Sequence, residues 1–151
     1  MTDHYFSRKQ SSRPRYQQLA VNLRGVGLTL TTSSGIFSKD HIDKGTQLLI
    51  DTATVPQDGT LLDLGCGYGP VGLSIAKAHP RVHVTLSDIN ERAVKLSRKN
   101  AKDNGIPNVT TIQSDIYGNI PQTFDTILLN PPQTAGKAIC QQMIQEAPGH
   151  L

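Results

Sequence analysis

The fold of this chain is decided by residues 61–69, Leu-Leu-Asp-Leu-Gly-Cys-Gly-Tyr-Gly. An apolar run ends in an acid, and three glycines then follow at every second position. The pattern predicts a buried strand that turns sharply into a helix, because glycine adopts backbone angles that a Cβ atom forbids. Glycines at such a turn also let a ligand approach the main chain closely. We therefore expect a ligand site at the end of this strand.

An alternation of predicted strands and helices surrounds this stretch. We expect strands at 60–64, 82–87, 109–113 and 124–129, and helices at 70–78, 91–103 and 137–146. Strands separated by helices are typical of parallel βαβ units with right-handed crossovers. The sequence therefore predicts an α/β protein with a Rossmann-like parallel sheet.

The residues before this alternation form a lead-in. Residues 1–24 are polar and basic, and they are interpreted as an arm or a short helix. Such a segment is either a solvated terminus or an arm that binds RNA phosphates. Alternating apolar and polar residues predict a strand at 26–32, and Asp43 resembles a helix N-cap. We expect a basic arm with the first strand at 1–30 and a small domain at 31–151.

Composition narrows the class of protein. With 151 residues, 36% of them hydrophobic and 18% charged, the chain suits a soluble domain with its own core. Its net charge of +3 favours an anionic partner. Cys66 and Cys140 suit neither a disulfide scaffold nor a zinc site. No apolar run approaches the ~20 residues that span a bilayer, and no signal peptide is recognisable. We expect a cytoplasmic protein without a metal or membrane partner.

Polar side chains follow the other predicted strands. Asp88 ends the second strand, Asp115 follows the third, and Asn130 ends the fourth. A ligand of an open parallel sheet binds outside the carboxyl ends of its strands, so these side chains converge on one crevice. An acid at the position of Asp88 accepts hydrogen bonds from ribose hydroxyls. Asp115 is placed to meet an adenine amino group.

The glycine spacing indicates which ligand the crevice binds. A dinucleotide site needs Gly-x-Gly-x-x-Gly, whereas here the third glycine comes one residue early. Pro70 also removes one of the helix amides that would hold a pyrophosphate. We therefore expect an adenosine compound without phosphates, namely S-adenosylmethionine, and not a nicotinamide cofactor. The simpler interpretations are a tight turn without ligand, an N-capping Asp88 and a turn aspartate at 115.

The segment Asn130-Pro131-Pro132 predicts the reaction. Two prolines stiffen the chain and donate no hydrogen bond, which leaves carbonyl oxygens facing the crevice. Asn130 adds a side-chain oxygen that accepts hydrogen bonds. Two fixed acceptors suit a planar NH2 group held in line with a methyl on sulfur. The alternative is a helix start, with asparagine as the cap and proline in the first turn.

Taken together, these motifs resemble the class I small-domain methyltransferases, and in particular the ribosomal RNA guanine-N2 methyltransferases. The similar segments are His-Tyr-Phe-Ser (4–7), Ser-Gly-Ile-Phe-Ser (34–38), Asp-Lys-Gly-Thr (43–46), the glycine loop (63–69), Asp-Ile-Asn (88–90), Asn-Pro-Pro (130–132) and Ala-Gly-Lys (135–137). The resemblance implies cofactor contacts from Asp63, Gly65, Cys66, Gly67, Gly69, Asp88, Ile89, Asp115 and Asn130. It implies that Asn130, Pro131 and Pro132 hold the target amine, and that Phe37, Gln133 and Lys137 contact the substrate.

The sequence departs from this family in two ways. Gln133 stands where family members carry an apolar or aromatic residue that would stack on a flipped base. The family sheet has the order 3-2-1-4-5-7-6, and the sequence supplies only strands 3-2-1-4. We therefore expect a chain truncated at its C-terminus, whose fourth strand is an exposed edge open to self-association. Three alternatives remain: a non-catalytic cofactor-binding remnant, methylation of a protein glutamine, and methylation of a DNA adenine.

Overall fold

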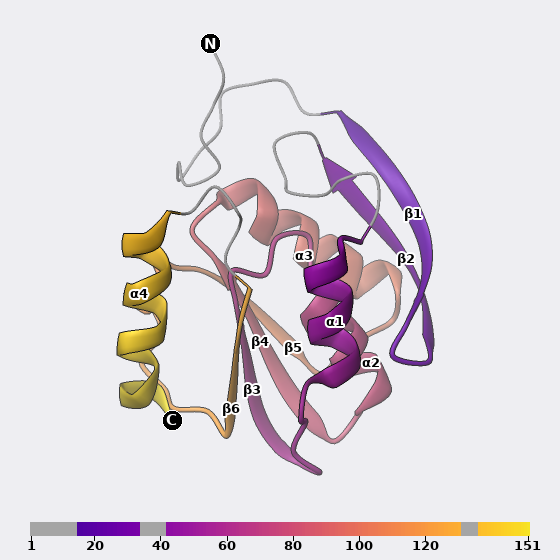
Figure 1. Ribbon diagram of the computed structural model, residues 1–151. Coiled ribbons are helices and arrows are strands. Elements are labelled where there is room, and N and C mark those ends of the chain that lie inside the picture. Colours follow the sequence, from indigo (N-terminus) through magenta and orange to yellow (C-terminus); the bar gives the residue numbers. More distant parts are fainter. Residues whose placement is uncertain (1–14, 34–41, 131–135) are drawn as a thin grey trace.

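The computed structural model describes residues 15–33, 42–130 and 136–151 (Figure 1). Its strands are β1 (Tyr16–Leu23), β2 (Val26–Ser33), β3 (Gly59–Leu64), β4 (Val82–Asp88), β5 (Val109–Gln113) and β6 (Thr126–Leu129). Its helices are α1 (Lys44–Thr52), α2 (Pro70–Ala78), α3 (Glu91–Asp103) and α4 (Lys137–Glu146), and a short 3-10 helix follows at Ala147–His150. The predicted alternation is confirmed, and three of its helices have the predicted bounds.

The main sheet has the strand order β5-β4-β3-β6, and every pair in it is parallel. Leu62 of β3 pairs with Thr85 of β4 on one side and with Ile127 of β6 on the other. This confirms the predicted Rossmann-like order 3-2-1-4. Within the described residues β6 pairs with β3 alone and lies at the sheet edge. Self-association through that edge stays a prediction.

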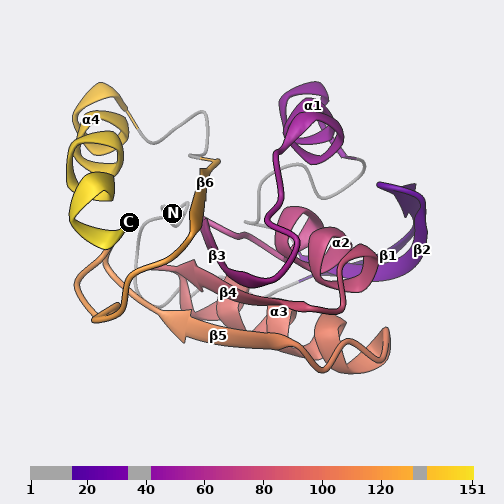
Figure 2. The ribbon, with the colours of Figure 1, turned by 90° about the horizontal axis from the view of Figure 1, so that it is seen from below.

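The two faces of the sheet are covered differently, as Figure 2 shows from below. Leu61 points into a large cluster shared with α1, α2 and α3, whereas its neighbour Leu62 points into a smaller cluster with Met143 of α4. Both leucines are fully buried. Successive side chains on a strand point to opposite faces, so β3 serves both clusters.

The hairpin of β1 and β2 is a feature that the sequence interpretation missed in part. An arm or short helix was expected at 1–24, but Tyr16–Leu23 is a strand paired antiparallel with β2; residues 1–14 lie outside the described residues. Arg24 and Gly25 both have positive φ, 50° and 79°, as a tight two-residue hairpin turn requires. Arg24 tolerates this because its guanidinium donates to the carbonyl of Ile50 at 2.7 Å and to His79 Nε2 at 3.0 Å.

The helix starts follow local capping chemistry. Asp43 caps α1 as predicted, its carboxylate accepting from the backbone N–H of Thr46 at 2.9 Å. Helix α2 begins with Pro70 in its first turn, directly after Gly69. Asn90 caps α3 by accepting from the N–H of Ala93 at 3.1 Å. These starts place the N-terminal turns of α2 and α3 beside the carboxyl ends of β3 and β4.

Candidate functional site

The glycine loop joins β3 to α2 at the carboxyl edge of the sheet. Gly65, Gly67 and Gly69 all have positive φ, and the N–H groups of Gly65 and Cys66 both donate to the carbonyl of Ser87 at 2.9 Å. A Cβ atom on Gly69 would lie 2.7 Å from a methyl carbon of Leu73. The positive φ angles confirm the sharp turn that the glycines predicted, and at Gly69 a side chain would also have no room.

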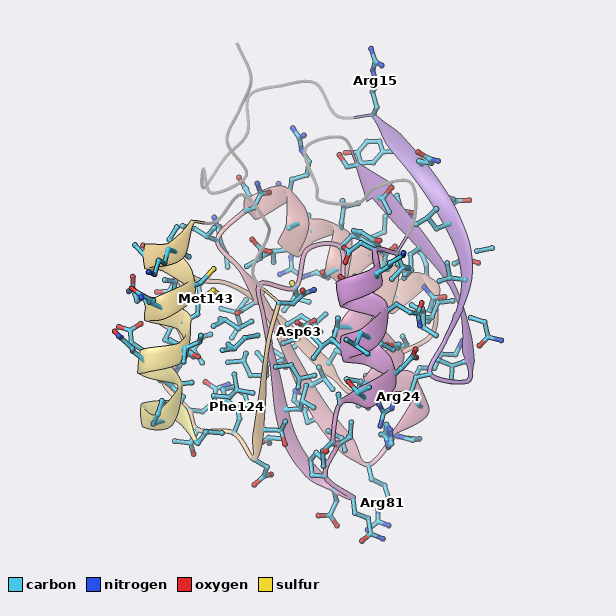
Figure 3. The ribbon with its side chains drawn as sticks, in the orientation of Figure 1. Arg15, Arg24, Asp63, Arg81, Phe124 and Met143 are labelled. Carbon is cyan, nitrogen blue, oxygen red and sulfur yellow. The ribbon has the colours of Figure 1, made fainter. Side chains whose placement is uncertain are left out.

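Asp63 lies beneath this loop and braces the start of α2. Its Oδ2 accepts from the N–H of Gly72 at 2.9 Å, and the residue has no exposed surface. Burial raises the pKa of this carboxyl to about 7; the negative charge of Asp88 adds to the rise, and the Gly72 N–H opposes it. Figure 3 shows Asp63 in the interior between α4 and α1. A cofactor contact from Asp63 stays a prediction, because the bond that the structure gives it is to Gly72 of α2.

Asp88 ends β4 and connects the loop to the crevice. Its Oδ2 accepts from the N–H of Gly67 at 3.0 Å, and its Oδ1 accepts from the N–H of Asn90 at 2.9 Å. Both carboxylate oxygens of Asp88 therefore accept from main-chain N–H groups on the two sides of the crevice, and a contact with ribose hydroxyls stays a prediction. Asp88 therefore both fixes the loop and faces the pocket beside it.

That pocket is a cavity of about 130 Å³ at the strand ends. It is lined by Leu64, Gly65, Asp88, Ile89, Ser114, Asp115, Ile116, Ile139, Gln142 and Met143. The structure thus brings four predicted cofactor residues together: Gly65, Asp88, Ile89 and Asp115. Ile116, which has φ of 53°, and the α4 side chains were not predicted. The position of α4 over this pocket follows from the tertiary structure and not from a local pattern, since its residues are far from the glycine loop in sequence.

The lining fits an adenosine compound better than a phosphorylated one. Among the described lining residues there are two carboxylates and no lysine or arginine, so hydroxyl and amino donors find acceptors while phosphates would find no cation. The apolar side chains of the lining, Ile89 and Ile116 among them, suit a flat ring. This set of acceptors agrees with the interpretation drawn from Pro70 and the glycine spacing.

The thiol of Cys66 lies against α3, and a cofactor contact from this residue stays a prediction. Its thiol lies 3.4 Å from the hydroxyl of Ser97 and 3.5 Å from the carbonyl of Gly67, and the residue is 5% exposed. Burial raises the pKa of the Cys66 thiol well above its usual value, and the charges of Asp88 and Asp63 add to this rise. The sulfur therefore stays protonated and acts as a small packing group within the loop.

Two polar residues of α3 hold the loop from behind, and the sequence interpretation missed both. The Ser97 hydroxyl donates to the carbonyl of Gly67 at 2.8 Å. The amide of Asn100 donates to the carbonyls of Tyr68 and Thr31 at 2.9 and 3.0 Å, and it accepts from the N–H of Thr31 at 2.8 Å. A signal existed, because Ser97 and Asn100 fall on the same helix face as the buried Ala93.

Asn130 lies where β6 meets the glycine loop. The N–H of Asn130 donates to the carbonyl of Leu64 at 3.4 Å. A Cβ atom built on Gly65 would come 3.2 Å from the carbonyl oxygen of Asn130. The Asn130 side chain donates from Nδ2 to the hydroxyl of Thr46 at 3.3 Å. The strand end predicted to hold the target amine is therefore adjacent to the strand end predicted to hold the cofactor.

The remaining predicted residues are placed as follows. Lys137 is exposed at the first turn of α4 and does not line the cavity. Phe37, Pro131, Pro132 and Gln133 lie outside the described residues. Their roles stay predictions. Over the described parts of the chain, no group of three His, Cys, Asp or Glu side chains could hold a metal ion, and no helix has the length and apolarity to cross a membrane.

Comparison with known proteins gives the family. The profile described as methyltransferase small domain matches residues 27–151. The uncharacterized protein YbxB of Bacillus subtilis (strain 168) is 44% identical over 154 residues, covering 100% of this chain and 77% of YbxB. Ribosomal RNA small subunit methyltransferase C of Hamiltonella defensa is 37% identical, covering 94% of this chain and 41% of that protein. The enzyme of the same name from Escherichia coli (strain SMS-3-5 / SECEC) is 38% identical, covering 83% and 37%.

Solved structures agree on the fold. The T. thermophilus 16S rRNA N2 G1207 methyltransferase RsmC, solved with AdoMet and guanosine, has a TM-score of 0.79 at 23% identity, covering 90% of this chain and 39% of that one. The M. jannaschii tRNA m1G37 methyltransferase has a TM-score of 0.61 at 18% identity, covering 89% and 40%. The chain thus spans about two fifths of these enzymes' length.

The fold, the pocket and the profile match lead to one assignment. The sheet order, the glycine loop and the acids at the strand ends occur together in residues 59–130, inside the matched range. YbxB extends the likeness over the full length of this chain. The chain belongs to the methyltransferase small domain family and is, by that membership, an S-adenosylmethionine-dependent methyltransferase.

Proposed function

We propose that this protein methylates an exocyclic amino group, N2 of a guanine in ribosomal RNA. The observation that carries the proposal is the position of Asn130, whose main chain touches Gly65 of the cofactor loop at the neighbouring strand end. The relatives named ribosomal RNA small subunit methyltransferase C support the choice of substrate. A ribosomal RNA substrate implies action in the cytoplasm.

In this proposal the chain supplies position and aimed dipoles. When bound, the cofactor would supply an electrophilic methyl on sulfur for transfer to N2; the sulfur would leave as a neutral thioether, and the proton lost by N2 would pass to water. Asn130 Oδ1 accepts a hydrogen of the target NH2 group and stabilises the positive charge that grows on nitrogen. Asp88 and Asp115 fix the adenosine part, so the two reactants meet in one orientation.

A basic groove beside the site supports RNA as the partner. It has a volume of about 710 Å³ and is lined by Tyr16, Gln17, Gln18 and Thr31 of the hairpin and by Glu91, Arg92, Lys95, Leu96 and Lys99 of α3. Lys95 pairs with Glu91 at 3.3 Å, and Lys99 pairs with Asp103. Exposed ion pairs of this kind contribute little stability, so both lysines can turn to phosphates instead. Tyr16 is 63% exposed and offers a ring for base stacking.

The Asn130→Ala variant tests the proposal. Transfer of labelled methyl from S-adenosylmethionine to unmodified small-subunit ribosomal RNA should be abolished, while cofactor affinity by calorimetry should change by less than about tenfold, since every predicted cofactor residue other than Asn130 is intact. Asn22→Ala, an exposed asparagine of β1, is the matched control and should keep full activity.

Two outcomes would contradict the proposal. Full turnover by Asn130→Ala would remove its central residue from the reaction. Methyl incorporation by the unaltered protein into DNA adenine or a protein glutamine, with none into ribosomal RNA, would replace the substrate. Mapping the methylated nucleotide by mass spectrometry then identifies the position.

A further inference from the structure

The side chain of Asn130 is joined to helix α1 by a chain of hydrogen bonds. Asn130 Nδ2 donates to Thr46 Oγ1 at 3.3 Å, and the Thr46 hydroxyl donates to Asp43 Oδ2 at 3.1 Å. The other carboxylate oxygen of Asp43 accepts from the backbone N–H of Thr46 at 2.9 Å. Asp43, Thr46 and Asn130 therefore form one hydrogen-bonded unit. It joins the start of α1 to the end of β6, since Thr46 and Asn130 are 84 positions apart in sequence.

The direction of each bond follows from the groups involved. An ionised carboxylate only accepts hydrogen bonds, so the single hydrogen of the Thr46 hydroxyl goes to Asp43. The hydroxyl oxygen then has only lone pairs to offer Asn130, and only the NH2 edge of the amide can meet them. The carbonyl edge of the Asn130 amide consequently points away from α1.

Burial makes this arrangement hard to replace. Thr46 is 5% exposed, so water has little access to its hydroxyl. The carboxylate lies close against the first turn of α1, since a Cβ atom built on Gly45 would be in contact with Asp43 Oδ1 at 3.4 Å. Burial raises the pKa of Tyr68 in the glycine loop, and the negative charge of Asp43 adds to this rise. The unit thus lies between the lead-in helix, the loop and the reactive strand end.

We propose that Thr46 is a positioning residue for methyl transfer: its hydroxyl, oriented by Asp43, fixes the Asn130 amide with Oδ1 toward the target amine. The inference rests on the proposed function, because it gives Oδ1 the role of acceptor. Without the Thr46 hydroxyl the amide rotates between two orientations, and in one of them an NH2 group faces the NH2 of the substrate. Turnover then falls although both reactants still bind.

Kinetics of paired Thr46 variants test the proposal. Thr46→Val keeps the shape and the backbone N–H that Asp43 caps, but it lacks the hydroxyl; Thr46→Ser keeps the hydroxyl. We expect Thr46→Val to lower kcat roughly tenfold with KM for RNA and cofactor affinity within about twofold, as the loss of one orienting hydrogen bond predicts. Thr46→Ser should restore kcat. Thr52→Val, an exposed threonine of the same helix, is the control.

A readout independent of activity separates this inference from the proposed function. In ¹⁵N-labelled protein the side-chain NH2 signals of Asn130 should exchange slowly with water, shift in Thr46→Val and return in Thr46→Ser. Unchanged signals in Thr46→Val, or a Thr46→Ser variant as impaired as Thr46→Val, would overturn the inference. Slow exchange that depends on the hydroxyl, in a protein that does not methylate ribosomal RNA, would support the positioning role and overturn only the proposed substrate.

Discussion

The two faces of the main sheet differ in how they are built and in what they do. The face that carries Leu61 packs against three helices and the hairpin, and its polar residues, such as Asn100, brace the glycine loop. The face that carries Leu62 packs against α4 over a small cluster, and the pocket predicted to hold the cofactor opens beside it. The comparison teaches that one face holds the binding main chain in place while the other leaves the space in which a ligand binds.

The largest expected effect comes from a pair of neighbouring leucines. Leu61→Ala and Leu62→Ala delete equal, fully buried side chains from opposite faces of β3. We expect Leu61→Ala to lower the free energy of unfolding by about 4 kcal/mol and Leu62→Ala by about 2 kcal/mol, because a smaller cluster relaxes more readily around a cavity. Urea unfolding measures both, and equal losses would mean that the two faces contribute alike.

Asp63 gives the next effect, and it depends on pH. Its pKa rises from an ordinary 3.8 to about 7 in the folded protein, so the folded state holds the proton more tightly than the unfolded state. Stability from this group is complete below about pH 4 and is lost as pH rises through 7. Asp63→Asn keeps an acceptor for the Gly72 N–H and should remove that loss, a difference on the order of a few kcal/mol at pH 8. Unfolding midpoints of both proteins from pH 4 to 8 check this, and parallel curves would rule it out.

The smallest effect on stability is expected for a substitution on the outer surface of α3, which should instead weaken RNA binding. Lys95→Glu changes an exposed groove residue, so the free energy of unfolding should move by no more than about 0.5 kcal/mol. Affinity for ribosomal RNA should fall, and the slope of log affinity against log salt should shrink by about one. Lys102→Glu, on the same helix but outside the groove lining, is the control. If both variants bind RNA equally well, the groove is not the RNA surface.

Much of this fold was predictable because local signals and tertiary structure agree. The glycine spacing, Pro70 and the cap at Asp43 mark element ends that the structure confirms. The first strand of the hairpin was missed because Arg24-Gly25 is a turn pair stabilised by distant partners, Ile50 and His79, and not by its own sequence.

The site was predictable where a strand end carries the residue. Asp88 and Asp115 line the pocket because parallel strands finish at one edge, a rule that needs only the strand assignment. Ile139 and Met143 were not predictable in this way, because they reach the pocket from a helix whose packing is set by the whole fold. The hydrogen bond between Thr46 and Asn130 likewise joins segments that no local pattern connects.

The brace at Asn100 restricts which amino acids position 100 can accept. Aspartate has the right length but lacks the two amide hydrogens, and glutamine has them but adds a methylene where the residue has no exposed surface. Substitutions there are tolerable only together with compensating changes in the hairpin and in the turn at Tyr68. In any set of relatives, then, the identity at this one site should report whether those two distant segments keep the same mutual geometry.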